Sequence, residues 1–122
     1  MMKRLRKHLS SQENAWRGMV DMLATQLNFN IELVAAAVVI IAGFFFQISQ
    51  VEWFAVILCI ASVLAAETIN TSIEMACDAI TKEYNTYIRA SKDMGAAAVL
   101  IVAIASFIIG CMIFLPKIAV LL

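Results

Sequence analysis

The sequence lacks the patterns that identify most soluble enzymes. Its three cysteines, Cys59, Cys77 and Cys111, lie in apolar stretches without CxxC or Cys/His spacing, which argues against a disulfide framework or a zinc site. It has no GxxxxGK(S/T), GxGxxG or HRD-like motif, which argues against a P-loop enzyme and a protein-kinase fold. Nine basic residues balance nine acidic ones, and no nucleic-acid partner is expected.

Two long stretches, residues 33–51 and 94–116, also lack any charged residue, and 63% of the 122 residues are hydrophobic. A helix of about 20 apolar residues crosses the roughly 30 Å hydrocarbon core of a bilayer. The whole chain is therefore predicted to be one all-α membrane domain, with spans at about 31–50 and about 92–116. Ser91 is a candidate N-cap for the later span.

A third apolar stretch, residues 53–66, has only fourteen residues. It is long enough to cross a bilayer only if its helix continues through Glu67 and Asn70. Two spans alone would leave this strongly apolar segment in water. We therefore predict a helix over about 53–80 whose last turns extend into the cytoplasm.

Apolar residues recur at helical spacing before the first span. Trp16, Met19 and Leu23 would share one face of a helix, with Arg17 and Asp21 on the other side. This pattern predicts an amphipathic helix over about 5–28 that lies in the membrane interface. A simple anchor is as good an interpretation of this helix as a direct role in function. No removable signal peptide is expected.

Lysine and arginine are unevenly distributed around the predicted spans. Five precede the first span, three lie in the connection over residues 81–93, and none lies in the short QISQVEW connection. By the positive-inside rule, the N-terminus and the 81–93 connection are cytoplasmic in this multi-pass protein.

The segment ETINTSIE places polar side chains on one face of a helix. At about 100° per residue, Asn70, Thr71, Glu74 and Asp78 fall within about 60° of Glu67. Ionisable residues inside a membrane helix cost roughly 2.5 to 3.5 kcal/mol each, so several on one face indicate partners or a reaction. The alternative is a helix that leaves the bilayer near residue 66 and exposes a solvated face, which is the expected state of Asp78.

Two carboxylates and an amide at the cytoplasmic boundary of a membrane suit phosphoryl transfer. That reaction needs a base near the acceptor hydroxyl, a carboxylate that holds Mg²⁺ against the nucleotide, and a cation near the phosphates. Glu67, Glu74 and Lys92 have these chemical types.

The segment AETINTSIE, followed by EYNTYIRASKDMGAAAVLI, resembles the prokaryotic diacylglycerol kinase family, which has an E-x-x-N-x-x-x-E segment and a K-D-M-G-x-A-A-V-L-I segment. The resemblance extends from AWRG through the third span. It implies three transmembrane helices and an amphipathic N-terminal helix, assembled as a homotrimer with shared active sites in the bacterial inner membrane. It also implies transfer of the γ-phosphate of MgATP to the hydroxyl of a lipid alcohol.

The same resemblance implies roles for individual side chains. Glu67 corresponds to the catalytic base, and Asn70 to a group that positions Glu67 and the γ-phosphate. Glu74 corresponds to a metal ligand and Lys92 to a phosphate contact. Nucleotide contacts are implied at Asp93, Glu83, Tyr84 and Asn85, and by position alone at Lys7 and Asn14.

One position departs from the family pattern. The family has an acidic metal ligand before the first span, and Gln26 stands at the matching position. A glutamine carbonyl can bind Mg²⁺ but brings no negative charge, so the metal would depend more on Glu74 and on the phosphates of ATP. Glu32 follows about a turn and a half later and is not taken as a substitute.

Two lipid acceptors fit the resemblance. Diacylglycerol, which would yield phosphatidic acid, is the first choice by family analogy, and undecaprenol is the alternative. A function of a different class is a small transporter or holin-like protein whose buried glutamates bind protons or cations. A small multidrug transporter normally has a fourth span and a carboxylate in its first, whereas residues 33–51 have no charge. ATP-dependent lipid phosphorylation would separate these functions.

Overall fold

The computed structural model describes residues 1–122 as four helices. All of the regular structure is helical, and α2, α3 and α4 are each long and apolar enough to cross a membrane. The all-α class is thereby confirmed, and these three helices are the candidates for the three predicted spans. The helices are α1 (Met2–Thr25), α2 (Leu27–Phe45), α3 (Gln50–Ile80) and α4 (Thr86–Ala119).

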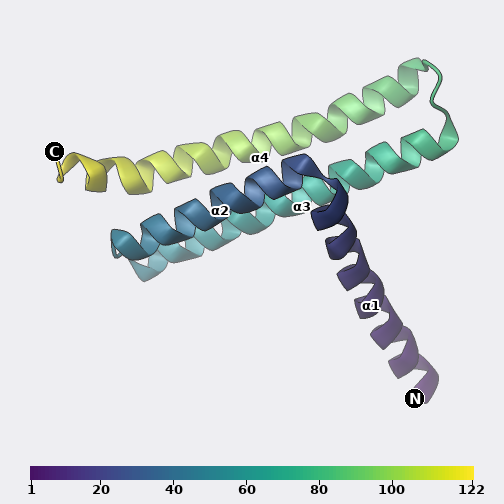
Figure 1. Ribbon diagram of the computed structural model, residues 1–122, viewed down its shortest axis with the longest axis horizontal. Coiled ribbons are helices and arrows are strands. Elements are labelled where there is room, and N and C mark those ends of the chain that lie inside the picture. The colour runs from purple at the N-terminus through teal and green to yellow at the C-terminus, as the bar shows by residue number, and fades with distance from the viewer.

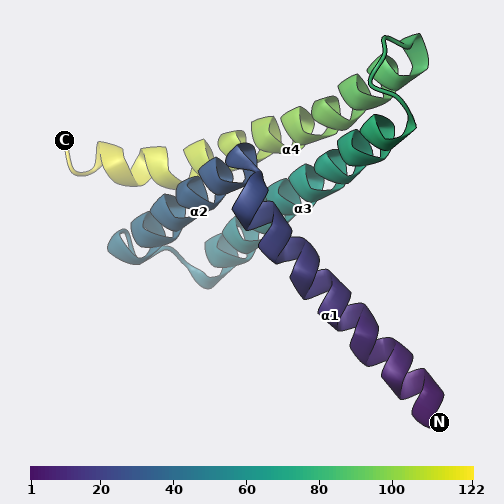
Figure 2. The same ribbon diagram turned by 45° about the vertical axis from the view of Figure 1, so that its right-hand side comes forward.

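The two longest helices form an antiparallel hairpin (Figure 1). At 1.5 Å per residue, the 31 residues of α3 and the 34 residues of α4 extend about 46 and 51 Å. The short helix α2 packs along the part of the hairpin that lies away from the α3–α4 loop (Figures 1 and 2). The loop end of the hairpin therefore projects beyond α2.

The helix ends differ from the predicted ranges. Helix α1 begins at Met2 and ends at Thr25, not at about 5 and 28. Helix α4 begins at Thr86, not near 92, because Asn85 caps it in place of Ser91. The Asn85 Oδ1 atom accepts hydrogen bonds from the backbone N–H groups of the second and third residues of α4 at 2.9 and 3.1 Å.

The first span also has different limits, Leu27–Phe45 in place of about 31–50. A single extended residue, Gln26, separates it from α1, with φ −108° and ψ 104°. The Gln26 N–H donates to the carbonyl of Met22, and its own carbonyl accepts from the Asn30 N–H. The chain thus changes direction without a loop, and α1 projects away from the other three helices (Figure 2).

A capping box starts α3 at Gln50, three residues before the predicted start. The Glu52 N–H donates to Ser49 Oγ at 3.2 Å, and the Ser49 N–H donates to Glu52 Oε2 at 2.7 Å. The other oxygen of Glu52 accepts from Lys117 Nζ at 2.6 Å. This ion pair joins the first turn of α3 to the last turns of α4.

Candidate active site

The polar stripe of α3 faces the interior of the helix bundle over its first half. Glu67, Asn70 and Thr71 expose only 5%, 7% and 4% of their surface. Glu74, one turn further on, is half-buried, and Asp78 is exposed. The stripe therefore runs along one helix face from the buried carboxylate of Glu67 to the exposed carboxylate of Asp78. Only the Asp78 end agrees with the alternative of a polar face in contact with water.

Helix α4 lies close to the stripe at Gly95. A Cβ atom at Gly95 would overlap Asn70 Oδ1, so only glycine permits this spacing with Asn70 in its present position. The Asn70 Nδ2 group donates to Glu74 Oε1 at 3.2 Å, which orients the amide. Its Oδ1 atom is buried without a hydrogen-bond partner, and such an atom is usually explained by a missing ligand, water or ion.

The Glu67 carboxylate lies near groups from two helices. The Asn28 side chain, close to the start of α2, lies beside it. Glu74 of α3 and Glu32 of α2 are near enough for their charges to interact with that of Glu67. The junction of α1 and α2 therefore lies at the buried end of the stripe. Gln26 is at this junction, and its Nε2 group donates to Thr25 Oγ1 at 2.9 Å.

Lys92 and Asp93 both make ion pairs at the start of α4. Lys92 Nζ donates to Asp78 Oδ1 at 2.6 Å, which connects α4 to the solvated end of the α3 stripe. Asp93 Oδ2 accepts from Arg89 Nη1 at 2.9 Å within α4. The Lys92 and Asp78 side chains are 36% and 48% exposed, so an anion from solvent has access to the lysine.

The other predicted nucleotide residues are not gathered around Glu67. Glu83 and Tyr84 lie in the α3–α4 loop, and both are exposed. Asn85 ends that loop as the cap of α4. Lys7 and Asn14 lie on α1, which points away from the hairpin in both views (Figures 1 and 2). One chain therefore brings together Glu67, Asn70 and Glu74, and Lys92, which is paired with Asp78, lies near enough to Glu74 for their charges to interact.

The donor atoms near Glu74 fit a magnesium ion that arrives with a nucleotide. Mg²⁺ takes oxygen ligands, retains several waters, and is usually bound by one or two carboxylates together with substrate phosphates. Glu74 offers a half-buried carboxylate held by Asn70, and Asn70 Oδ1 is a buried oxygen without a partner. No group of three or more His, Cys, Asp or Glu side chains is arranged as a metal site.

Three residues at this site were not found from the sequence. Gly95 had a signal, because a glycine inside a helix costs about 1 kcal/mol relative to alanine and often marks close packing. Glu32 had a signal only as an acidic residue six positions after Gln26, which does not place it near Glu67. Asn28 had no signal, because its place beside Glu67 depends on how α2 packs against α3.

Known proteins are similar to this chain over most of its length. The family model described as prokaryotic diacylglycerol kinase matches residues 13–114. Undecaprenol kinase of Bacillus subtilis (strain 168) is 38% identical over 113 residues, which cover 93% of this chain and 92% of that protein. A diacylglycerol kinase of Synechocystis is 32% identical over 88% of this chain and 62% of that protein. Diacylglycerol kinase of Escherichia coli (strain K12) is 28% identical over 81% of each. The chain therefore belongs to the prokaryotic diacylglycerol kinase family of membrane lipid kinases.

Proposed function

We propose that this protein transfers the γ-phosphate of ATP to the hydroxyl group of a membrane lipid alcohol. Membership of a lipid kinase family carries the proposal. The buried position of Glu67 among helices long and apolar enough to span a membrane supports it, because a carboxylate there is costly unless it has a partner or takes part in a reaction. The transporter or holin-like alternative has no comparable support.

In the proposed reaction, Glu67 accepts the proton of the acceptor hydroxyl as the hydroxyl oxygen attacks the γ-phosphorus. The bond from the γ-phosphorus to the bridging oxygen breaks, and ADP leaves. Asn70 positions the reacting groups, since its amide is fixed by Glu74 on one side and by the α4 backbone at Gly95 on the other. When ATP binds, Lys92 releases Asp78 and donates to a phosphate oxygen instead. The phosphate carries more negative charge than the carboxylate and is therefore the stronger partner for an ammonium group.

Glu74 would hold Mg²⁺, with the carbonyl oxygen of Gln26 as a neutral ligand. When bound, the ion neutralises charge on the β- and γ-phosphates. Further contacts to the nucleotide are proposed, as the family resemblance implies, at Asp93, Glu83, Tyr84, Asn85, Lys7 and Asn14.

The acceptor is either undecaprenol or diacylglycerol. Diacylglycerol was the first expectation from the motifs. The 38% identity to a protein named undecaprenol kinase, over nearly the full length of both chains, gives undecaprenol at least equal support. Both are lipid alcohols, so the same base and phosphate contacts serve either one.

We also propose a homotrimer in the bacterial inner membrane, with the N-terminus and the active site on the cytoplasmic side. Lys7 and Asn14 lie on α1, away from Glu67 of the same chain, so a site that includes them needs a neighbouring subunit. Small exposed residues on α3, including Ala61 and Ala65, permit close helix packing. The exposed apolar side chains of α1 would then rest in the membrane interface.

The test offers radiolabelled ATP and Mg²⁺ to the purified protein with diacylglycerol and undecaprenol in separate micelles. Label in either lipid supports the proposal, and the ratio of kcat/KM values identifies the acceptor. Label in neither lipid, from protein with the expected helical content, would refute it.

Assembly is tested by mixing Glu67→Gln subunits with Asn14→Ala subunits, each of low activity alone, after each has been dissociated. Regained activity means that one site draws these two residues from different chains. If activity stays low although labelled subunits exchange, both residues serve a site within one chain.

A further inference from the structure

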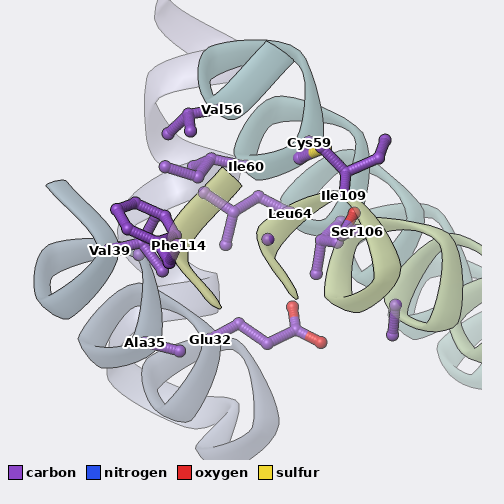
Figure 3. A pocket seen from close by; sticks show the side chains of 14 residues that line it. Glu32, Ala35, Val39, Val56, Cys59, Ile60, Leu64, Ser106, Ile109 and Phe114 are labelled. Carbon is purple, nitrogen blue, oxygen red and sulfur yellow. The ribbon is translucent and has the colours of Figure 1, made fainter. Parts of the chain in front are cut away.

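Helix α4 is charged near its start and apolar toward its end. The α4 residues that line the apolar cavity between α2, α3 and α4 (Figure 3) all lie at or beyond Ala103. Arg89, Lys92 and Asp93, by contrast, lie close together near the start of the helix. The Arg89 and Asp93 side chains are 56% and 63% exposed. The start of α4 is therefore open to charged solutes from water.

These charged side chains form a strip along one face of α4. At about 100° per residue, Lys92 and Asp93 fall within about 60° of Arg89, one on each side of it. Asn85, which caps the helix, precedes Arg89 by four positions, or about one turn. A ligand that contacts both Asn85 and Lys92 therefore has to lie across Arg89. Asn85, Lys92 and Asp93 have proposed contacts to the nucleotide, and Arg89 is the member of the strip without a role.

The ion pair of Arg89 contributes little to the helix. Arg89 Nη1 donates to Asp93 Oδ2 at 2.9 Å. Exposed pairs of this kind have little effect on stability, and a base four residues before an acid is the less favourable order on a helix. The bond also uses one N–H group of a guanidinium that has five. Arg89 thus has donors to offer to a ligand.

Lys92 is paired in a similar way one turn later. Its Nζ group donates to Asp78 Oδ1 at 2.6 Å, and the charges of Glu74 and Lys82 also act on this pair. Arg89 and Lys92 are two cations about 4.5 Å apart along the helix axis, and each is held by a carboxylate with a single negative charge. A chain of phosphates carries more charge and offers oxygens along its length, so it can replace both carboxylates.

We propose that Arg89 is a second phosphate-binding cation beside Lys92. The proposal rests on the proposed lipid kinase function and adds a residue to its nucleotide site. Lys92 is near Glu74 and binds the γ-phosphate, whereas Arg89 lies one turn closer to the α3–α4 loop and binds the phosphates that remain in ADP. The planar guanidinium can hold two phosphate oxygens at once. Its move to phosphate leaves Asp93 free for its own contact with the nucleotide.

A contact to phosphates that ATP and ADP share predicts a particular kinetic change. Such a contact stabilises the bound substrate and the transition state equally, so its loss raises the KM for ATP and leaves kcat nearly unchanged. Arg89→Met removes the charge and keeps an unbranched side chain. We expect it to raise the Kd of both MgATP and MgADP by roughly tenfold, as for the loss of a hydrogen bond to a charged group. Arg89→Lys should recover part of this loss.

Equilibrium dialysis of radiolabelled MgADP against the protein in micelles measures binding without turnover. Lys117→Met is the matched control, because it also removes one cation and one ion pair, but at the opposite end of the α3–α4 hairpin. The Kd should rise for Arg89→Met and equal that of the wild type for Lys117→Met. Arg89→Met should also unfold at the wild-type temperature, because its ion pair is exposed.

A double variant separates a direct phosphate contact from an effect through Asp93. If Arg89 binds phosphate itself, Arg89→Met should raise the Kd of MgADP again when it is added to Asp93→Asn. If Arg89 only orients Asp93, the second substitution should change nothing. That result would overturn the proposal.

The outcomes also separate this inference from the proposed function. Equal Kd values of MgADP for the wild type and Arg89→Met would overturn the role of Arg89 and leave the lipid kinase function intact. A large fall in kcat with an unchanged Kd of MgADP would overturn it too, because Arg89 would then act on the transferred phosphate. Wild-type protein that binds neither MgATP nor MgADP would overturn the proposed function and this inference together.

Discussion

Replacement of Gly95 by alanine separates helix packing from catalysis. In an exposed helix interior this change would stabilise the helix by about 1 kcal/mol, because alanine has the higher propensity. Here the new Cβ would overlap Asn70 Oδ1, and added bulk in a packed interior typically costs about 1 to 3 kcal/mol. The overlapping atom is at the end of a side chain that can rotate, so the cost is at the low end and roughly offsets the gain.

The consequence for the reaction is larger. Asn70 avoids the new methyl group only by moving its amide, which breaks the hydrogen bond to Glu74 at 3.2 Å. A displacement of about 1 Å at a positioning residue can lower a rate by on the order of a hundredfold. Gly95→Ala should therefore leave the thermal unfolding temperature nearly unchanged while greatly reducing phosphoryl transfer.

The assay compares thermal unfolding in detergent with transfer of labelled phosphate to the lipid. Gly18→Ala is the control, because Gly18 lies in α1 with nothing within 4 Å of an added Cβ. It should gain up to about 1 kcal/mol in stability and keep its rate. A Gly95→Ala protein with wild-type turnover would refute the assigned role of Asn70.

Other substitutions test single residues of the proposed mechanism. Glu67→Gln should remove most phosphoryl transfer with unchanged unfolding, and near wild-type turnover would make Glu67 a structural residue. Gln26→Glu should lower the Mg²⁺ concentration for half-maximal rate severalfold, because a charged oxygen binds a hard cation better than a neutral one. Glu74→Gln should raise that concentration or abolish turnover. If the Mg²⁺ titration curves of the wild type and both variants superimpose, neither residue is a metal ligand. Asn85→Ala should lower the free energy of unfolding by about 1 kcal/mol through loss of the α4 cap, whereas Asn85→Asp should keep the stability of the wild type. If Asn85→Ala also unfolds like the wild type, the cap does not contribute to stability.

The membrane helices were predictable because hydropathy alone determines them. The charge-free runs at 33–51 and 94–116 specify two spans, and the need to bury residues 53–66 predicts that α3 continues through Glu67. The helical period also places Glu67 and Asn70 on one face. The structure agrees on these points because each depends on one helix at a time.

Helix ends were less predictable. Asn85 and Ser91 are both good N-cap residues, and the local sequence does not decide between them. The break at Gln26 has no proline or glycine to mark it, and it depends on the packing of α1 and α2. The positions of Glu32 and Gly95 required knowledge of which helix faces meet. The pair of Lys92 with Asp78, 14 residues apart, likewise depends on the geometry of the α3–α4 hairpin.

The length of that hairpin has a consequence for the proposed reaction. Helices of about 46 and 51 Å exceed the roughly 30 Å thickness of membrane hydrocarbon. One continuous pair of helices would therefore contact bilayer hydrocarbon over part of its length and water over the rest. ATP in water and a lipid alcohol in the bilayer could then react on the same pair of helices, while ATP stays in water and the lipid tail stays in the hydrocarbon. In the proposed reaction, the charge of the phosphorylated product would be created on the aqueous side, and no phosphate group would have to enter the hydrocarbon.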